Sequence, residues 1–412
     1  MRKVEIIKQK KCRLCKSTEI SGILNLGDVP ITSYFPKLEE MDPPSAPLHM
    51  VICSGCGLIQ LQHSVNQDFL FGNVYGYRTG LNTEMVLHVQ DLAHQLKAVS
   101  GIEAGASVLD IGSNDGTFLN VLIGNRFNLV GIDPNADDMR EYYDNEIEIV
   151  SNFFSGNNFD KKFDLITSIA MFYDVEDPVS FAKNIESSLA ENGIWFFEQS
   201  YALTMFENFS FDTICHEHLM YYTVDVLNKI LDLANLKIDD IQLSSANGGS
   251  VGIFASKKSS NRLVKVNVDD FIQKESARLP NLIANFQLNV RLIKKQVVDF
   301  VIGEAASGKS FWCIGASTKG NTILSYFQLN DQVISGIADK NPLKIGRVTP
   351  GTRIPIFPKE ALVEANPDYA IVLPWHFKKS ISENESDYLR NGGKLIFPLP
   401  IFQVVEDQIR QD

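Results

Sequence analysis

The stretch Ser107-Val-Leu-Asp-Ile-Gly-Ser-Asn-Asp-Gly-Thr-Phe-Leu119 decides the fold class of this chain of 412 residues. It predicts a buried strand, a loop and the start of a helix, and the glycines at 112 and 116 let the backbone approach a ligand closely. A dinucleotide site would need the pattern Gly-x-Gly-x-x-Gly, whereas Asn114 and Asp115 occupy this loop. The loop therefore suits a ligand with an amino-acid group better than a pyrophosphate.

A second acid supports a ligand site at this loop. Asp133 lies 23 residues after Asp110, at the end of the next predicted strand. An acidic side chain at such a position accepts hydrogen bonds from ribose hydroxyls. The loop resembles the first motif of class I methyltransferases, which holds the aminocarboxypropyl end of S-adenosylmethionine. A non-catalytic α/β domain and a nicotinamide-binding domain are the alternatives.

Strands and helices are expected to alternate along most of the chain. Between residues 107 and 243, apolar strand runs alternate with helical stretches, which predicts a parallel α/β sheet. Apolar residues at helical spacing predict a helix over 82–97, and another helix is expected over about 268–302. A second alternating series follows, with strand runs at 311–315, 333–339, 369–374 and 393–398. We therefore expect two α/β units.

The first 66 residues contain two cysteine pairs. Cys12-x-x-Cys15 and Cys53-x-x-Cys56 can each place two thiolates on a tight turn, so that four sulfurs surround a zinc ion. Four thiolates leave no open coordination position, so the zinc is expected to be structural. A small region broken by glycine and proline needs such a link. Four unrelated buried cysteines are the alternative.

Composition limits the class of protein. Hydrophobic residues make up 44% of the chain and charged residues 21%, a balance that indicates a folded globular protein. The net charge of −12 argues against a nucleic-acid partner. No apolar run approaches 18 residues and the N-terminus lacks the pattern of a signal peptide, so we expect a cytoplasmic protein without a membrane partner.

A cluster of ionisable residues follows the strand predicted at 194–199. His216-Glu217-His218 lies where strands of such a sheet deliver their ligand loops. The two histidines are too close together for the His-Glu-x-x-His motif of metalloproteases. Imidazole titrates near neutral pH, so the cluster favours general acid/base chemistry. A structural His-Glu cluster is the alternative.

Two glycine loops near residue 310 differ in their context. Gly303-Glu-Ala-Ala-Ser-Gly-Lys-Ser310 fits the letters of a P-loop, but a strand and not a helix is predicted after it. Gly315-Ala-Ser-Thr-Lys-Gly320 follows that strand and opens a predicted helix. Its amides and Lys319 are therefore suited to an anion at the helix N-terminus.

The order of these motifs resembles one family along residues 12 to about 400. The cysteine pairs, Asp-Ile-Gly-Ser-Asn-Asp-Gly-Thr-Phe, Glu-His-Leu, Gly-Gly-Ser and Gly-Ala-Ser-Thr-Lys-Gly are similar to those of the sugar-nucleotide C-methyltransferases, which make branched deoxysugars such as tetronitrose and mycarose. The resemblance implies a zinc-binding domain at 1–66, a class I Rossmann-like methyltransferase domain at 67–245 and a second Rossmann-like domain for the sugar nucleotide at 246–412. The substrate implied is a GDP- or dTDP-linked 4-keto-6-deoxyhexose, methylated at C3.

The same resemblance implies roles for individual residues. His218 would remove the proton beside the 4-keto group, with Glu217 orienting His218 or the sugar and Tyr222 completing the catalytic set. The contacts expected for S-adenosylmethionine are Asp110, Gly112, Ser113, Asn114, Asp115, Gly116, Asp133 and Pro134. The contacts expected for the sugar nucleotide are Tyr75, Tyr77, Asn247, Ser317, Lys319, Asp339, Lys340 and Trp375.

Three positions depart from the family pattern. Asn247 stands where some members have histidine, Gly252 where arginine is common, and Asp174 where histidine is frequent. These departures bear on the identity of the sugar more than on proton removal. An O- or N-methyltransferase acting on a related sugar nucleotide and a non-catalytic zinc-containing binding protein stay as alternatives. A monomer is expected.

Overall fold

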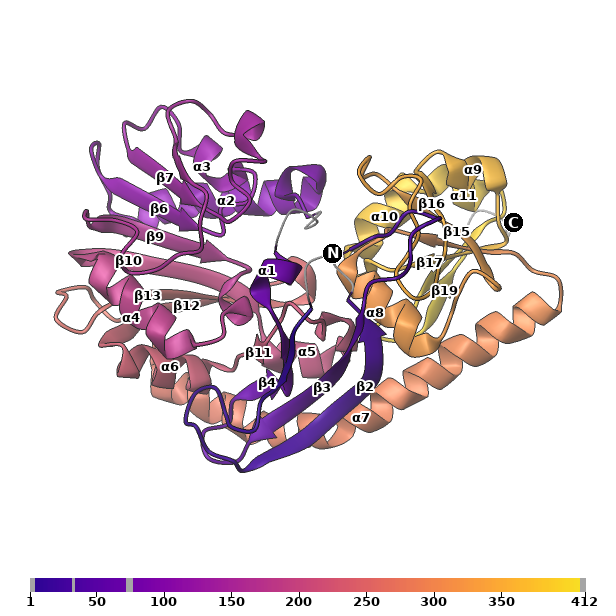
Figure 1. Cartoon of the computed structure of the whole chain (residues 1–412), viewed down its shortest axis with the longest axis horizontal. Helices are drawn as coiled ribbons and strands as arrows, with labels where there is room; N and C mark the ends of the chain where they lie inside the picture. The colour runs from indigo at the N-terminus through magenta and orange to yellow at the C-terminus, as the bar shows by residue number, and fades with distance from the viewer. Residues whose placement is uncertain (1–3, 32–33, 72–76, 408–412) are drawn as a thin grey trace.

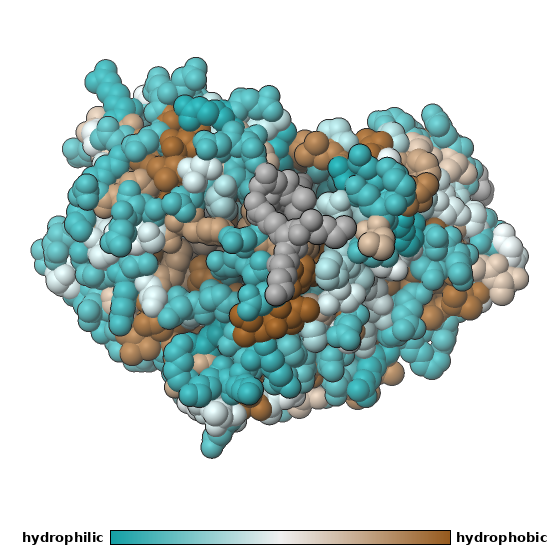
Figure 2. Space-filling view, in the orientation of Figure 1, coloured by the Kyte–Doolittle hydropathy of each residue, from teal (hydrophilic) through white to brown (hydrophobic). Residues whose placement is uncertain are grey.

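The computed structural model describes residues 4–31, 34–71 and 77–407. Figure 1 shows two α/β lobes, joined below by an antiparallel sheet and by the long helix α7 (Val268–Ala306). Hydrophilic residues cover most of the face seen in Figure 2, and apolar residues lie there in separate patches. Within the described ranges, no helix combines the length and apolar character of a membrane span.

The first lobe is built on a large, mostly parallel sheet with the strand order β12-β13-β10-β9-β6-β7-β8. Strands β6 to β10 run parallel, whereas β13 runs antiparallel to both of its neighbours. The strands are β6 (Ser107–Ile111), β7 (Asn128–Ile132), β8 (Glu148–Val150), β9 (Phe163–Ile169), β10 (Leu189–Ser200), β12 (Leu236–Ser244) and β13 (Ser250–Lys257). The predicted α/β class is confirmed.

Helices cover both faces of this sheet. Along β10, Phe196 packs in the cluster that contains α2 (Thr83–Ser100) and α3 (Thr117–Val121). Its neighbours Trp195 and Phe197 point to the opposite face, toward α4 (Pro178–Ser188) and α6 (Val224–Leu233). This alternation follows from the two-residue period of a strand. Helix α2 begins where the sequence predicts, because the Asn82 side chain accepts hydrogen bonds from the Glu84 and Met85 amides.

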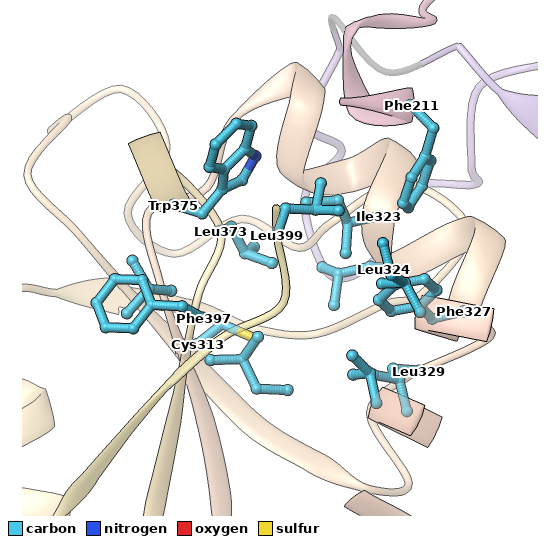
Figure 3. Close-up of a cluster of buried hydrophobic side chains, with 14 of the residues drawn as sticks. Phe211, Cys313, Ile323, Leu324, Phe327, Leu329, Leu373, Trp375, Phe397 and Leu399 are labelled. Atoms are coloured by element: carbon cyan, nitrogen blue, oxygen red, sulfur yellow. The ribbon is translucent and has the colours of Figure 1, made fainter. Parts of the chain in front are cut away.

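The second lobe has the strand order β16-β15-β14-β17-β18-β19. Its strands are β14 (Phe311–Ile314), β15 (Ile334–Asp339), β16 (Ile356–Pro358), β17 (Tyr369–Val372), β18 (Lys394–Phe397) and β19 (Gln403–Val405), and only β19 is antiparallel among them. Its helices are α8 (Thr318–Phe327), α9 (Ala361–Ala365), α10 (Lys378–Asn384) and α11 (Ser386–Arg390). In the core of this lobe, Leu373, Phe397 and Ile323 of α8 belong to one buried cluster, and Phe211 of the first lobe points into the same cluster (Figure 3).

The N-terminal region forms a small antiparallel sheet, β11-β4-β3-β2. It consists of β2 (Ile20–Pro30), β3 (Ser45–Cys53), β4 (Ile59–Leu61) and, from the middle of the chain, β11 (Met220–Tyr221). A separate pair, β1 (Ile6–Lys8) with β5 (His63–Val65), leads into α1 (Gln67–Leu70). The sheet packs on α5 (Ala202–Glu207), on α7 and on the second lobe in one hydrophobic cluster.

The large sheet does not end at residue 245. Strand β13 lies between β10 and β12, so residues 250–257 belong to this sheet and not to the second lobe. The boundary expected at 245/246 falls at Ala246-Asn-Gly-Gly, between β12 and β13. The rejected P-loop motif, residues 303–310, spans the last turn of α7 and the turn before β14, so a strand and not a helix follows it, as the sequence predicts.

Candidate active site

A cavity of about 570 Å³ is lined by residues of both lobes. The first lobe contributes the loop after β6, the ends of β7 and β9, and the loop that carries His218. The second lobe contributes Ser317 and Lys319, from the start of α8, and His376, from the loop after β17. Since parallel strands deliver their loops at the carboxyl edge, the two lobes present their ligand edges to one shared space.

The loop after β6 has the geometry of a donor site. Gly112 has a φ of 72°, which favours glycine, and a Cβ there would meet the Met171 side chain at 3.1 Å. Asp110 is buried and accepts a hydrogen bond of 2.6 Å from Thr167 Oγ1, and burial raises the pKa of its carboxyl to about 7. Ser113 and Asn114 also line the cavity.

Asp133 lies beside this loop and fixes its shape. Its carboxylate accepts hydrogen bonds from the Asn114 amide at 3.1 Å and from the Asn135 amide at 2.8 Å. Burial raises the pKa of this carboxyl. Asp133 and Pro134 both line the cavity.

Two of the expected donor contacts lie outside the cavity lining of the described structure. The buried Asp115 carboxylate accepts a hydrogen bond from the Gly80 amide at 2.8 Å and pairs with Arg78 at 3.3 Å. At Gly116, a Cβ would meet the Tyr143 ring at 2.6 Å, and φ is 72°. Both residues therefore shape the loop and do not contact the donor, because protein neighbours already fill the space beside them.

The loop between β10 and β11 carries the acid/base cluster. His218 lines the cavity, and its Nδ1 lies 2.8 Å from the carbonyl oxygen of Thr213. A carbonyl only accepts, so Nδ1 carries the hydrogen and the lone pair is on Nε2. Burial, followed by the charge of Lys319, lowers the pKa of His218 to about 3. His218 is therefore neutral at neutral pH.

Glu217 and His216 differ in their placement. Glu217 is buried and lines the cavity, but Thr213, and not Glu217, holds Nδ1 of His218. His216 points away from the cavity, and its Nε2 lies 3.0 Å from the carbonyl oxygen of Ala46 in β3. Sequence reasoning does not identify Thr213, because a backbone carbonyl carries no residue-type signal.

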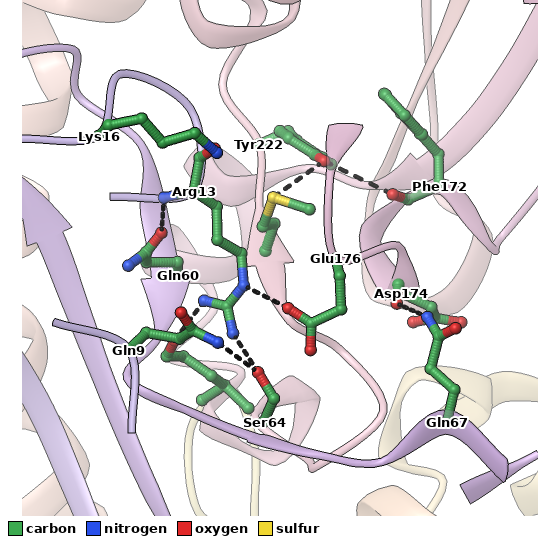
Figure 4. Close-up of polar contacts among 12 residues, drawn as sticks. Gln9, Arg13, Lys16, Gln60, Ser64, Gln67, Phe172, Asp174, Glu176 and Tyr222 are labelled. Carbon is green, nitrogen blue, oxygen red and sulfur yellow. Dashed lines mark hydrogen bonds and ion pairs between the residues drawn. The ribbon is translucent and has the colours of Figure 1, made fainter. Parts of the chain in front are cut away.

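The structure does not bring Tyr222 into the cavity lining. Its ring is fully buried and stacked on Phe172, with 5.3 Å between the ring centroids. Its hydroxyl donates to the sulfur of Met220 at 3.2 Å (Figure 4). Tyr222 therefore belongs to the core of the first lobe, and we correct its expected place in the catalytic set.

The expected sugar-nucleotide contacts divide into two groups. Tyr77, Asn247, Ser317 and Lys319 line the cavity, and Tyr75 falls outside the described residues. Lys319 Nζ donates to the carbonyl oxygen of Asn247 at 3.1 Å, which joins the two lobes across the cavity.

Asp339, Lys340 and Trp375 are not part of the described cavity lining. Asp339 accepts hydrogen bonds from the amides of Ala316 at 2.6 Å and Asn341 at 2.7 Å, as Asp133 does in the first lobe. The Trp375 ring is buried, and its Nε1 donates to Asp212 at 2.9 Å. These groups are already used to shape the loops, and Lys340 is exposed.

Other cavity residues were not among the predicted contacts. They include Tyr173, Asp174, Cys215 and His376. Tyr173 and Asp174 follow β9 and His376 follows β17, so their position after a strand is a signal that the sequence contains. The Tyr173 ring lies 4.3 Å from the His218 ring between centroids.

The four N-terminal cysteines come together at one point. Their sulfurs lie within 4.8 Å of one another, with 3.5 Å between Cys12 and Cys56 and 3.4 Å between Cys15 and Cys53. Four converging thiols free of disulfides are the donor set of a structural zinc site. Zinc held by Cys12, Cys15, Cys53 and Cys56 would link the turn at 12–15 to the end of β3.

Comparison with known proteins identifies the kind of enzyme. Residues 12–71 match the model of a zinc binding domain, 85–241 that of a methyltransferase domain and 245–400 that of a C-methyltransferase C-terminal domain. The C-methyltransferase NovU of Streptomyces niveus is 27% identical over 408 residues, which cover 96% of each protein. The chain is an S-adenosylmethionine-dependent C-methyltransferase related to NovU. Its four-cysteine cluster is a zinc site.

Solved structures align with parts of this C-methyltransferase. An S-adenosylmethionine-dependent methyltransferase from Clostridium acetobutylicum is 15% identical, over 42% of this chain and 92% of its own, with a TM-score of 0.35. Magnesium protoporphyrin IX methyltransferase from Synechocystis with bound S-adenosylmethionine is 13% identical, over 42% of this chain and 79% of its own, with a TM-score of 0.33.

Proposed function

We propose that this C-methyltransferase adds a methyl group to C3 of a nucleotide-linked 4-keto-6-deoxyhexose, with His218 as the base. One observation carries the proposal. His218 is a neutral imidazole whose Nδ1 is held by Thr213, and it lines the same cavity as the donor loop and Lys319. A base next to both a methyl donor and a cation is suited to carbon acids, whose conjugate bases need charge stabilisation.

The chemistry follows from this placement. Nε2 of His218 takes the proton on C3, the electrons of the C–H bond form a double bond to C4, and the ketone oxygen becomes an enolate. S-adenosylmethionine supplies an electrophilic methyl group, which the enolate carbon accepts. His218 must be neutral to take the proton, and burial holds it so. Closure of the site between two lobes would position both reactants and exclude water.

Lys319 connects substrate binding with the base. Its ammonium lies at the start of α8, a helix of 10 residues whose N-cap is Ser317, so an acceptor diphosphate would meet both a cation and free amides there. The Lys319 charge also lowers the pKa of His218. A bound diphosphate would offset this charge and return basicity to His218 when substrate is present. Asn247 and Tyr77 are the further acceptor contacts in the proposal.

Product analysis tests the proposed reaction. The purified enzyme is incubated with S-adenosylmethionine carrying a ¹³C methyl group and, separately, with GDP- and dTDP-linked 4-keto-6-deoxyhexoses. We expect a ¹³C methyl signal on C3 of one sugar, coupled to ring carbons. A signal typical of an O-methyl or N-methyl group would show that the methyl group goes to oxygen or nitrogen, and it would reject C-methyl transfer to this acceptor. No transfer to either sugar nucleotide would reject the substrate class.

A further inference from the structure

Asp174 is a half-buried acid in the cavity that the reaction above does not use. It ends the short turn Phe172–Asp174 after β9 and lines the cavity together with His218 and Glu217. Its Oδ1 is buried, and it has no hydrogen-bond partner among the described residues. A buried carboxylate oxygen without a partner is costly, so an unmatched oxygen in a ligand cavity points to a ligand atom as its partner.

The surroundings of Asp174 favour its neutral form. Glu217 and Cys215 from the loop of His218, Tyr221 of β11 and Tyr222 directly after β11 face it, and all of these groups are neutral or anionic. The nearby Arg13 is engaged by Glu176 at 3.2 Å (Figure 4). Burial and the charge of Glu217 raise the pKa of Asp174 well above its ordinary value.

Asp174 is also held at a fixed place relative to the base. The Leu219 amide donates to the carbonyl of Tyr173 at 3.0 Å, which ties the loop of His218 to the turn of Asp174. The Tyr173 ring packs on His218. On the other side, Gln67 Nε2 donates to the backbone carbonyl of Asp174 at 3.3 Å (Figure 4).

We propose that Asp174 is a further catalytic residue, which acts as a neutral carboxylic acid and donates its hydroxyl hydrogen bond to the ketone oxygen of the acceptor. This role rests on the proposed function. As His218 removes the C3 proton, the negative charge moves onto the C4 oxygen, and the hydrogen bond from Asp174 strengthens. When C3 takes the methyl group, the C–S bond of the donor breaks, S-adenosylhomocysteine leaves and the C4 carbonyl forms again. Asp174 keeps its proton throughout, and the C3 proton leaves from His218 to water.

Three charged or polar groups thus have separate places and separate proposed roles in the cavity. Lys319 lies in the second lobe, where a diphosphate is proposed, and donates to the Asn247 carbonyl of the first lobe. His218 lies between the lobes, and Asp174 lies on the side of β9, next to the donor loop. A neutral acid in an apolar site is an efficient hydrogen-bond donor to an enolate, because it needs no countercharge.

The test compares two substitutions that differ in hydrogen-bond donation. Asp174→Asn keeps a donor of similar shape, whereas Asp174→Ala removes it. Exchange of the C3 hydrogen with D₂O is followed by NMR on the GDP- and dTDP-linked 4-keto-6-deoxyhexoses. We expect Asp174→Ala to slow exchange by about 100-fold or more, the usual effect of removing one such donor, and Asp174→Asn to retain most of it. Calorimetric binding of S-adenosylmethionine checks that each variant is folded.

A control and a pH series sharpen the test. Asp160→Ala changes an exposed acid near the opposite end of β9 and should leave exchange at the wild-type rate. Wild-type exchange should fall as rising pH ionises Asp174, and the Asp174→Asn variant should lack that fall. Wild-type rates in Asp174→Ala would overturn the proposal, as would equal loss in both variants. Absence of exchange in the wild-type enzyme with both sugars would reject the proposed function itself, which the variants alone do not test.

Discussion

Burial decides the protonation state of the histidines around the cavity. Burial lowers the pKa of His216 to about 4 and, together with Lys319, lowers the pKa values of His218 and His376 to about 3. An ordinary histidine titrates near pH 6.5, so each of these imidazoles is neutral where others are half charged. The sequence indicates an acid/base cluster, but it does not show which imidazole is a base, because that depends on Thr213 and Lys319.

Lys319→Met should raise the pKa of His218. The substitution removes the charge of Lys319, which is the second cause of the low pKa of His218. Burial, the first cause, remains, so the new pKa should stay below the ordinary value. NMR titration of the imidazole measures this shift directly, and KM for the sugar nucleotide should rise. Lys340→Met, which changes an exposed lysine outside the cavity, is the matched control. An unchanged His218 pKa would show that the charge of Lys319 does not act on this base.

Gly116→Ala should destabilise the protein by more than Gly105→Ala. Both glycines have positive φ, which costs a non-glycine residue about 1 to 2 kcal/mol. At Gly105 an added Cβ meets nothing within 4 Å, whereas at Gly116 it meets the Tyr143 ring at 2.6 Å. We expect a difference of about 1 to 3 kcal/mol between the two variants in free energy of unfolding. Equal destabilisation in thermal or urea unfolding would contradict this account.

At the scale of elements, local patterns identify the strands that carry ligand loops. The stretch 107–119 becomes β6, a glycine loop and α3, and the helix expected at 268–302 extends to Ala306. Long-range pairing is what local patterns miss. Strand β11 has only two residues and pairs with β4, more than 150 positions away in the chain. Tyr222 and Trp375 carry functional residue types, but neighbours distant in sequence bury them.

Zinc removal should disturb the catalytic loop before it disturbs the donor site. The zinc knuckle at Cys53 and Cys56 leads directly into β4, which pairs with β11, and the Leu61 amide donates to Leu219 next to His218 at 2.8 Å. A chelator or Cys12→Ser should therefore abolish methyl transfer and raise hydrogen exchange in β4, β11 and residues 213–219. Asp110 and Asp133 lie on the large sheet, so S-adenosylmethionine binding should persist. As zinc is removed, activity should be lost while S-adenosylmethionine still binds. Loss of both at the same zinc concentration would contradict this prediction.

At the scale of the whole molecule, the small sheet, α5 and α7 connect the second lobe to the first. A single hydrophobic cluster includes strands β2 to β4, α5, α7 and the second lobe. Phe206 of α5 and Phe286 of α7 lie at its centre, with 4.8 Å between ring centroids at an angle of 83°. The cavity depends on this union, because its lining comes from both lobes and no local sequence pattern specifies their relative position.

Phe286→Ala should therefore destabilise both lobes together. The ring is fully buried, and removing such a ring costs about 3 to 5 kcal/mol. Leu288→Ala, on the exposed side of the same helix, should cost little because Leu288 is 58% exposed. Scanning calorimetry should show the whole transition move to lower temperature for Phe286→Ala. A shift confined to one of two separate transitions would show that the lobes unfold independently.

Proton exchange at C3 of the acceptor tests the central claim most directly, because it reports proton removal without methyl transfer. The GDP- and dTDP-linked 4-keto-6-deoxyhexoses are incubated in D₂O with wild-type enzyme and with His218→Ala, and loss of the C3 proton signal is followed by NMR. His94→Ala, at an exposed position of α2, serves as the control. We predict exchange with the wild-type and His94→Ala enzymes and none above background with His218→Ala, which still binds S-adenosylmethionine. Exchange at the wild-type rate in His218→Ala would contradict the account.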